Sequence, residues 1–434
     1  MTSVPLSMPV QAPLRPSVAA GVFGALIASV TLLQKVGVPL GGEVVEVAFL
    51  VLWGALFVLL LFQPPVLHPM RLALFALFVL TMLVSQLAGG QPFSLASALL
   101  AVVVYLPFCF SIEVDAATYR RCLDMFVTAM LIVGLAVIVQ QVMQWRLGWT
   151  SWLDLNRFLP RYLSVPGYNY LQPVTYGSRF YKPNAFVFLE GSFVAQFIAL
   201  GLIVEVALFQ RVSRLVFLGA TLLLTFSGSG FLLLAVSAPF LVGRLSFRAL
   251  AALIFATAIA AALALGVGWF DQLHTRFGEV GARGSSGYYR YNLPFQIISD
   301  MASHPQYLWT GHGAGSTGHG DDQGVAGFIL IPAAKVIYEY GFVPTLAFYA
   351  FFTYAMFRAA PSLAVAIAVF VFYNLGGGGF VVPAYVVTGY VIAVLLRPVG
   401  RRRSLPDCGR PTQGQHQVAS FWGPAPPESP PLTG

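Results

Sequence analysis

The sequence predicts an all-α, polytopic integral membrane protein, and three observations lead to this fold class. Of the 434 residues, 58% are hydrophobic and only 9% are charged, a balance far from that of soluble domains. About twelve apolar runs approach the roughly 20 residues that a helix needs to cross a bilayer. Two long polar stretches, at about 144–184 and 269–340, interrupt these runs.

The apolar runs follow one another along the chain with short connections between most of them. Their approximate limits are 17–36, 44–63, 71–89, 92–112, 122–143, 185–208, 213–228, 229–244, 248–268, 341–358, 361–379 and 380–397. The seventh and eighth are short and separated only by Ser227-Gly228-Ser229-Gly230, where we expect a tight turn or a re-entrant pair. Residues 1–397 are therefore predicted to form one transmembrane domain, and the Pro-, Gly- and Arg-rich segment 398–434 a disordered tail.

Basic residues indicate how the chain is oriented. With both termini in the cytosol, fourteen of the 24 Lys and Arg residues fall on the cytosolic side, in short connections and the tail. They are Arg15, Arg71, Arg120, Arg121, Arg211, Arg214, Arg244, Arg248, Arg358, Arg397, Arg401, Arg402, Arg403 and Arg410. Short cytosolic loops carry an excess of positive charge. Both polar stretches are therefore expected to face outward.

Several function classes are excluded by what the sequence lacks. It has no nucleotide-phosphate loop, no HExxH and no CxxC, so chemistry driven by ATP is not expected. Most of the formal charge of +8 is explained by the topology, and no basic patch with interleaved aromatic residues indicates nucleic acid. Acidic residues do not cluster at ligand spacing, so we expect no metal and no other cofactor.

The first polar stretch places aromatic and basic residues where they suit the headgroup level of a bilayer. Glu190 follows it, inside the next apolar run. An unpaired carboxylate there costs at least about 2.5 kcal/mol, and Arg179 or Lys182 can reach back to it. The sequence leaves open a structural ion pair or a site that uses this pair.

The second polar stretch carries the denser signal. Arg276, Arg283 and Arg290 precede a short amphipathic helix that we expect from Tyr291 to Ser303. After Pro305 comes a glycine-rich turn, Gly311-His312-Gly313-Ala314-Gly315-Ser316, with His304 and His319 on either side. Glycines let backbone N–H groups approach a phosphate or a sugar hydroxyl. Taken singly, each histidine is interpreted as a solvated loop residue, whereas the turn, the three arginines and the three histidines together favour a binding site.

Four segments between residues 179 and 345 occur in the order of a known family. They are Arg179 with Phe188-Leu189-Glu190-Gly191-Ser192, then Thr225-Phe226-Ser227-Gly228-Ser229-Gly230, then Arg290 with His304-Pro305 and the glycine-rich turn, and last Tyr338-Glu339-Tyr340-Gly341. This order, inside about twelve spans, resembles the O-antigen ligase/polymerase superfamily, the Wzy- and WaaL-like membrane glycosyltransferases of bacterial surface polysaccharides. Gly191 stands where the family has proline, and Gly230 where arginine is common. The ligases' histidine motif is absent before the last segment, which favours a polymerase.

The resemblance implies a GT-C-like, metal-independent enzyme of the bacterial inner membrane. It would polymerise oligosaccharide repeat units carried on polyprenyl (undecaprenyl) diphosphate at the periplasmic face, with chain-length regulator and export proteins as further partners. The resemblance implies catalytic roles for Arg179, Arg290, Glu190 and His312, and substrate-binding roles for Arg276, Lys182, His304, Gly311, Gly313, Gly315 and Glu339.

The chemistry of these residues suits a diphosphate leaving group. Arginines bind phosphate with two hydrogen bonds and stay charged. Glu190, His304, His312 or Glu339 could accept the proton of the acceptor hydroxyl.

Other functions stay open at this point. They are ligase-type transfer, a twelve-span lipid-saccharide flippase or transporter, and a non-catalytic assembly partner. A transporter needs charges along a central pathway and commonly shows internal repeats. Beyond Glu190, the spans hold only edge charges such as Glu46, Asp124 and Glu205. This distribution favours glycosyl transfer.

Overall fold

The computed structural model describes residues 16–40, 43–62, 65–148, 155, 158–165, 168, 171–174, 178, 180–241, 247, 251, 288, 292–318, 330–358, 360–375 and 380–398. The chain divides into two compact units, Met1–Val399 and Gly400–Gly434. All described residues belong to the first unit. The predicted disordered tail lies outside the described residues except for its first position, Pro398.

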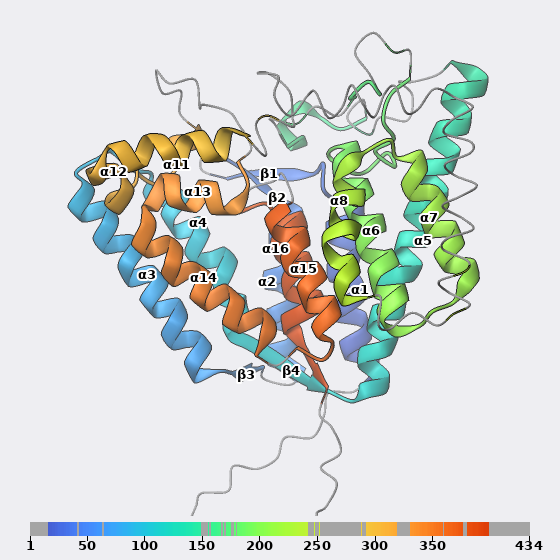
Figure 1. The fold of residues 1–434 in the computed structure, drawn as a ribbon. Helices are drawn as coiled ribbons and strands as arrows, with labels where there is room; N and C mark the ends of the chain where they lie inside the picture. Colours follow the sequence, from blue (N-terminus) through green and yellow to red (C-terminus); the bar gives the residue numbers. More distant parts are fainter. Residues whose placement is uncertain are drawn as a thin grey trace, which may run out of the picture. The chain divides into compact units, whose positions relative to one another are not determined.

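Apolar helices make up most of the described chain (Figure 1). They are α1 (Pro16–Leu32), α2 (Val47–Phe62), α3 (Pro69–Gly89), α4 (Leu95–Tyr105), α5 (Ala116–Leu147), α6 (Gly191–Leu208), α7 (Val212–Leu224), α8 (Gly228–Ser237), α14 (Phe342–Phe357), α15 (Leu363–Leu375) and α16 (Pro383–Gly389), which a π-helical segment (Tyr390–Leu395) continues. Three of them, α3, α5 and α6, are long and apolar enough to cross a membrane. Eleven of the twelve predicted spans coincide with one of these helices, whereas 248–268 lies outside the described residues except for Ala251. The number of membrane crossings stays a prediction.

Local sequence signals explain where several helices begin and end. The side chain of Asp115 accepts the N–H of Thr118 and caps α5, and Ser94 caps α4 in the same way. Short polar side chains at this position satisfy N–H groups that have no partner within the helix. At the other end, α3 and α5 stop at Gly90 and Gly148, which have φ values of 61° and 60°. Glycine adopts this left-handed conformation at little cost.

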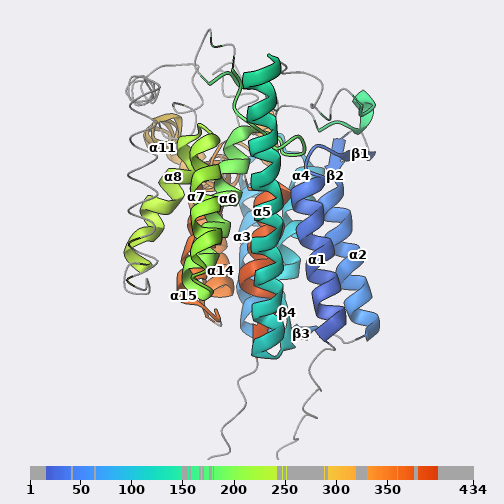
Figure 2. The ribbon, with the colours of Figure 1, turned by 90° about the vertical axis from the view of Figure 1, so that its right-hand side faces the viewer.

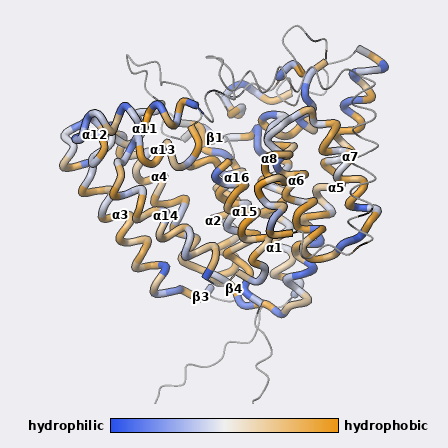
Figure 3. Tube along the Cα trace, viewed as in Figure 1, coloured by the Kyte–Doolittle hydropathy of each residue, from blue (hydrophilic) through white to orange (hydrophobic). Residues whose placement is uncertain are grey.

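The helices pack side by side, with hydrophobic residues along their lengths and hydrophilic residues gathered toward their ends (Figures 2 and 3). Hydrogen bonds show that α5 spans the whole bundle: Gln144 near its end contacts Tyr181, and Arg120 near its start contacts Leu208. We call the end that carries residues 180–190 the loop end. The opposite end, which carries the turn between α6 and α7, is called the base.

The central helix of the bundle is α6. Residues 191–206 of this helix are all buried, and α6 packs against α5, α7, α8 and α15. By comparison, only 28% of the most apolar part of α3 is buried. An apolar helix enclosed by other helices is part of a protein core, whereas one with an exposed apolar face suits lipid contact. The first residues of α6 are therefore held in a rigid setting.

The prediction of an all-α fold is incomplete because the structure also contains short strands. At the loop end, β1 (Gly37–Leu40) pairs antiparallel with β2 (Glu43–Glu46). A three-stranded sheet joins β3 (Val66–Leu67), β4 (Phe110–Val114) and β5 (Leu396–Pro398) at the base, with β3–β4 antiparallel and β4–β5 parallel. Parts of β2, β4 and β5 lie inside the predicted spans, because hydropathy alone does not separate a strand at the end of a helix from one more helical turn.

The second polar stretch forms three short helices at the loop end (Figure 1). The amphipathic helix expected from Tyr291 to Ser303 is confirmed as α11 (Leu293–Ser303), and α12 (Pro305–Thr310) and α13 (Pro332–Tyr340) follow it. Their apolar side chains enclose a small separate core that includes Ile297, Met301 and Ile337. Since α12 packs on α3 and α13 on α14, this core rests directly on the helix bundle.

Candidate functional site

Two groups of polar residues lie at the loop end. The Glu190 cluster contains Glu190, directly before α6, and Ser192 in its first turn, with Ser227 and Ser229 from the start of α8. The His312 cluster contains His312 and Thr317 from the glycine-rich turn, and Lys335 and Glu339 from α13. Each cluster is assembled from segments that are distant in the sequence.

Glutamine side chains of α5 hold the segment that leads to Glu190. The Gln140 side chain accepts the N–H groups of Asn184 (3.0 Å) and Ala185 (2.9 Å) and donates to the Asn184 side chain (3.0 Å). Ala185 and Phe186 adopt φ values of 47° and 65°. Such conformations cost non-glycine residues roughly 1–3 kcal/mol each, so they persist only where surrounding contacts determine them. This backbone is therefore shaped by α5.

Glu190 is buried, with 7% of its surface exposed, directly before the first turn of α6. Ser192 Oγ lies 3.1 Å from Glu190 Oε2 and donates to it. The positive end of the helix dipole also favours an anion at this position. Lys182 packs beside it: a Cβ on Gly191 would lie 2.8 Å from Lys182 Cβ and 3.1 Å from the Pro183 carbonyl oxygen. Gly191, where the family has proline, therefore makes room for Lys182.

The Thr225–Gly230 segment, which leads into α8, contacts the start of α6. The Oγ atoms of Ser227 and Ser229 lie 3.0 Å apart, and Ser229 donates to the carbonyl oxygen of Ser192 at 3.1 Å. A Cβ on Gly230 would lie 2.5 Å from the Ala195 carbonyl oxygen. Glycine at 230, where the family commonly has arginine, lets α8 pack closely on α6. The first two motif segments are thus brought together.

The glycine-rich turn packs tightly against α13. Gly311, Gly313 and Gly315 have φ values of 72°, 99° and 79°, conformations that L side chains rarely adopt. A Cβ on Gly311 would also lie 2.5 Å from the backbone of Glu339. These glycines therefore allow two backbone segments to approach each other.

The backbone N–H groups of this turn already have acceptors within the protein. Those of His312 and Gly313 donate to the carbonyl oxygens of Tyr338 (2.8 Å) and Glu339 (3.2 Å). The N–H of Gly311 donates to Tyr307 at 2.8 Å, and that of Ala314 to Gln86 Oε1 at 2.7 Å. The expectation that this turn presents its amides to a phosphate does not fit this geometry for these four groups. A substrate-binding role of the glycines stays a prediction.

The imidazole of His312 is held between two tyrosine rings. Its centroid lies 4.4 Å from that of Tyr307 and 4.2 Å from that of Tyr338, each ring tilted by 13° from the imidazole plane. Nδ1 lies 3.4 Å from the Tyr338 carbonyl oxygen. The tautomer protonated on Nδ1 would donate to this oxygen, which orients the imidazole. His312 is half-buried, so the ring is both oriented and accessible.

Glu339 and His304 differ from His312 in their surroundings. Glu339 is 1% exposed, accepts a hydrogen bond from Thr317 Oγ1 at 2.6 Å and lies 3.5 Å from Lys335 Nζ. Burial and the neighbouring Glu339 carboxylate raise the pKa of Tyr340 well above its usual value. His304 is exposed, with Nδ1 3.0 Å from Ser303 Oγ. An enclosed carboxylate is poorly placed to meet an incoming hydroxyl, so His312 is the better placed base in this cluster.

Sequence reasoning missed several residues of this site. Lys335 lies four residues before Glu339, and this spacing indicates an ion pair on one helix face, which the structure shows. Near the end of α3, Gln86 contacts the glycine-rich turn and α13, and Ser85 contacts the last residues of α12 and α13. Polar side chains inside an apolar run are a recognisable signal, but their partners cannot be read from the sequence.

Three of the predicted site residues, Arg179, Arg276 and Arg290, lie outside the described residues, as do Arg283 and His319. Their roles therefore stay predictions. Within the described ranges, no three His, Cys, Asp or Glu side chains gather in a way that could hold a metal ion.

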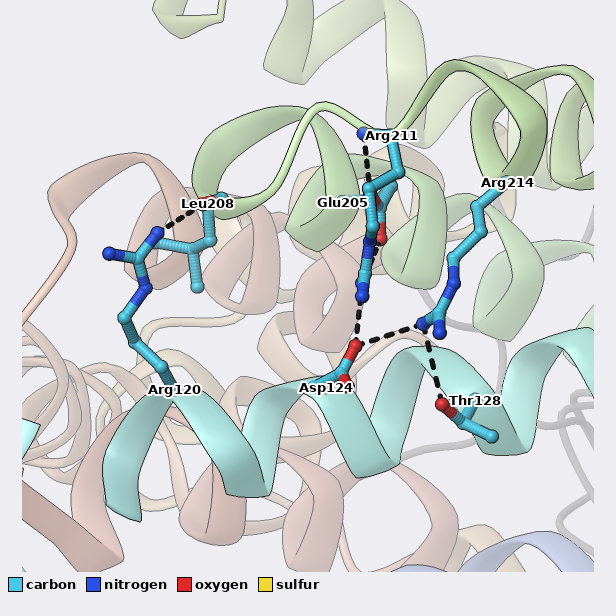
Figure 4. A network of polar contacts seen from close by, with 7 residues as sticks. All are labelled: Arg120, Asp124, Thr128, Glu205, Leu208, Arg211 and Arg214. Atoms are coloured by element: carbon cyan, nitrogen blue, oxygen red, sulfur yellow. Dashed lines mark hydrogen bonds and ion pairs between the residues drawn. The ribbon is translucent and has the colours of Figure 1, made fainter. Parts of the chain in front are cut away.

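At the base, acidic and basic side chains form an ion-pair network (Figure 4). Arg211 lies 2.6 Å from Glu205 and 2.6 Å from Asp124, and Arg214 lies 2.9 Å from Asp124. Glu205, expected as an edge charge, is in fact completely buried. This network joins α5, α6 and α7 at the end opposite the two clusters.

The fold and its polar clusters define a membrane protein with apolar helices, in which the two described catalytic candidates, Glu190 and His312, lie at one end of the bundle. The sequence model of the WcaD colanic acid polymerase family matches residues 23–319, which is 297 of the 434 residues. The chain therefore belongs to this family: it is an exopolysaccharide polymerase, a glycosyltransferase that polymerises lipid-linked repeat units. Neither the curated proteins nor the solved structures include a significant match.

This membership decides between the functions that the sequence left open. The predicted Wzy-type polymerase is confirmed, rather than a ligase or a flippase. The matched residues include the Glu190 cluster and His312, and end before Lys335 and Glu339.

Proposed function

We propose that repeat units are joined at the loop end and that this end faces the periplasm. The observation that carries the proposal is the separation of charges between the two ends. The Glu190 and His312 clusters lie at the loop end, whereas Arg120, Arg211 and Arg214 lie at the base. Short cytosolic connections are enriched in basic residues, which supports a cytosolic base and cytosolic termini.

The reaction joins two lipid-linked saccharides at an anomeric carbon. A hydroxyl oxygen of the acceptor forms a bond to this carbon, the bond from the carbon to the diphosphate oxygen breaks, and polyprenyl diphosphate leaves. The hydroxyl proton passes to a base, for which we propose the imidazole of His312. Its support is the stack with Tyr307 and Tyr338, which holds an accessible imidazole in one orientation.

Negative charge develops on the departing diphosphate, and cations near the membrane surface would stabilise it. We assign this role to Arg179 and Arg290, with Arg276 and Lys182 as further contacts, because guanidinium groups bind phosphate with two hydrogen bonds. Glu190 would orient these arginine and lysine side chains. It lies at the start of α6, directly before Gly191, whose backbone packs against Lys182. Cations fixed in a water-poor site stabilise developing charge more than they would in bulk water.

The assignment of His312 is tested in cells that lack the native gene. The His312→Ala variant should lower polymer formation by about 10²–10⁴-fold, the usual contribution of a positioned base, and single lipid-linked repeat units should accumulate. His68→Asn is the matched control, because His68 lies at the base beside Ser111 of β4. Normal polymer from His312→Ala at wild-type protein level would contradict the proposal.

The orientation is tested separately by labelling exposed positions with a membrane-impermeant maleimide. Ser303→Cys, at the end of α11, and Ser213→Cys, near the start of α7, both place a thiol on an exposed described residue. In a Cys408→Ser background, only Ser303→Cys should react from the periplasm of intact cells. The opposite pattern would reverse the orientation.

A further inference from the structure

Near its C-terminal end, α3 carries two buried polar residues that lie between the glycine-rich turn and α13. Ser85 and Gln86 are 6% and 4% exposed. We propose that they are positioning residues for His312, which they hold by fixing the two backbone segments on either side of it. This inference rests on the proposed role of His312 and deepens it.

The side-chain amide of Gln86 connects both segments at once. Its Oε1 accepts the N–H of Ala314 at 2.7 Å, and its Nε2 donates to the carbonyl oxygen of Glu339 at 3.2 Å. These partners are 228 and 253 residues away in the sequence. One buried side chain therefore sets the distance between the turn that carries His312 and the helix that carries Tyr338.

The hydroxyl of Ser85 contacts the same region at two other points, the end of α12 just before the turn and the last residue of α13. Its Oγ lies 2.7 Å from the Thr310 carbonyl oxygen and 2.6 Å from that of Tyr340. Thr310 and Tyr340 directly precede Gly311 and Gly341, where a Cβ would meet the opposite backbone. The two segments thus lie in van der Waals contact, with Ser85 donating into the joint between them.

His312 is located by this joint because its own backbone belongs to it. The N–H groups of His312 and Gly313 donate to the carbonyl oxygens of Tyr338 and Glu339. Displacement of the turn from α13 would separate the imidazole from the Tyr338 ring, 4.2 Å away, and from the Tyr338 carbonyl oxygen. A shift of about 1 Å in a catalytic group can lower a rate by about 10²-fold.

An apolar side chain in place of Gln86 would leave both segments without this connection. The N–H of Ala314 would then be buried without its acceptor, a loss that is costly unless the segment moves to find another. We therefore expect Gln86→Leu to displace the turn rather than to unfold the bundle, since the apolar contacts of α3 with α14 remain.

The test measures the rate of polymer formation by the full-length protein in membranes supplied with lipid-linked repeat units. Per folded protein, Gln86→Leu should lower kcat by about 10–10²-fold, the scale expected from misplacement, with little change in KM. Ser85→Ala should lower it less, and Ser85→Thr should restore most of that loss. Thr81→Val is the matched control, since the Thr81 hydroxyl bonds only to carbonyl oxygens of Leu77 and Phe78 in its own helix.

A second measurement reads the position of the turn without using activity. The thiol of a His312→Cys variant, in a Cys408→Ser background, should react with maleimide at a rate that Gln86→Leu changes several-fold and Thr81→Val leaves unchanged. Unchanged labelling together with an unchanged kcat in Gln86→Leu would overturn this inference while leaving the proposed function intact. A fully active His312→Ala variant would overturn the proposed function, and the labelling rate would then decide alone whether Gln86 positions the turn.

Discussion

The ion pair between Arg211 and Glu205 is expected to be the strongest single polar contribution to stability at the base. The Glu205 side chain is completely buried. Both of its carboxylate oxygens are used by Arg211, whose Nε lies 2.9 Å from Oε1 and whose Nη2 lies 2.6 Å from Oε2. The backbone N–H of Arg211 adds a third hydrogen bond to Oε1 at 2.8 Å. Replacing Arg211 by Ala would leave this buried charge with only the backbone donor.

The expected loss of stability depends on how deeply the remaining carboxylate is buried. Removing one member of a buried ion pair costs about 3–5 kcal/mol, and we expect the lower end for Arg211→Ala, because the arginine side chain is 34% exposed and water can replace part of it. Arg211→Lys keeps the charge but loses the two-point contact, at about 1.5–3 kcal/mol for a charged hydrogen bond. Arg214→Ala is the control: it contacts Asp124, which is 38% exposed, and exposed pairs contribute about 0–1 kcal/mol.

The assay is thermal unfolding of the purified protein in detergent, with polymer formation measured in parallel at a permissive temperature. The midpoint should fall most for Arg211→Ala, less for Arg211→Lys and least for Arg214→Ala. Folded protein of all three variants should retain activity, because this network lies at the base, away from His312. Equal midpoints for Arg211→Ala and Arg214→Ala would refute the reasoning that burial of Glu205 sets the cost.

Three further predictions concern the loop end and the energy source. Arg179→Ala and Arg290→Ala should each abolish polymer while the protein stays in the membrane. Lysine at either position should restore little, because it lacks the planar guanidinium that binds phosphate with two hydrogen bonds. Polymer analysis of complemented cells measures this, and normal polymer from both alanine variants would exclude the diphosphate contact. Gly313→Ala should lower the thermal midpoint, because φ is 99° and the new Cβ would lie 2.5 Å from the Pro92 carbonyl oxygen, whereas Gly219→Ala, with open space around it, should not. Purified protein given only lipid-diphosphate oligosaccharide should extend it with a chelator present and without ATP, since the activated bond supplies the driving force; a strict need for a divalent metal or a nucleotide sugar would show that the reaction is misassigned.

The positions of the helices could be predicted because the signals for them are local. Eleven of the twelve apolar runs coincide with helices, since a run of apolar residues needs a helix to satisfy its backbone in an apolar environment. Asp115 and Gly148 mark the start and end of α5 through contacts with residues only three or four positions away. The order of motif segments also sufficed to predict a polysaccharide polymerase, which family membership confirms.

The state of the site residues could not be predicted in the same way. Glu339 appeared as a candidate base, but Thr317 and Lys335 enclose it. The glycine-rich turn looked like a phosphate cradle, but four of its N–H groups have acceptors on α12, α13 and α3. Whether a polar group is free depends on which backbone lies opposite it, and the sequence does not specify that partner.

The sequence by itself determined where apolar helices form, where several of them end, and which residues are chemically able to act on a lipid diphosphate. Only the tertiary structure decided that Glu339 is buried and that His312 is half-buried and held in place. The contacts that hold His312 include those of Ser85 and Gln86, whose partners lie 225 to 255 residues away. Apolar periodicity and helix caps act over a few residues, whereas the joint that holds His312 depends on the packing of α3 against the turn and α13. Such hydrogen bonds join residues that only the packing of the helices brings together.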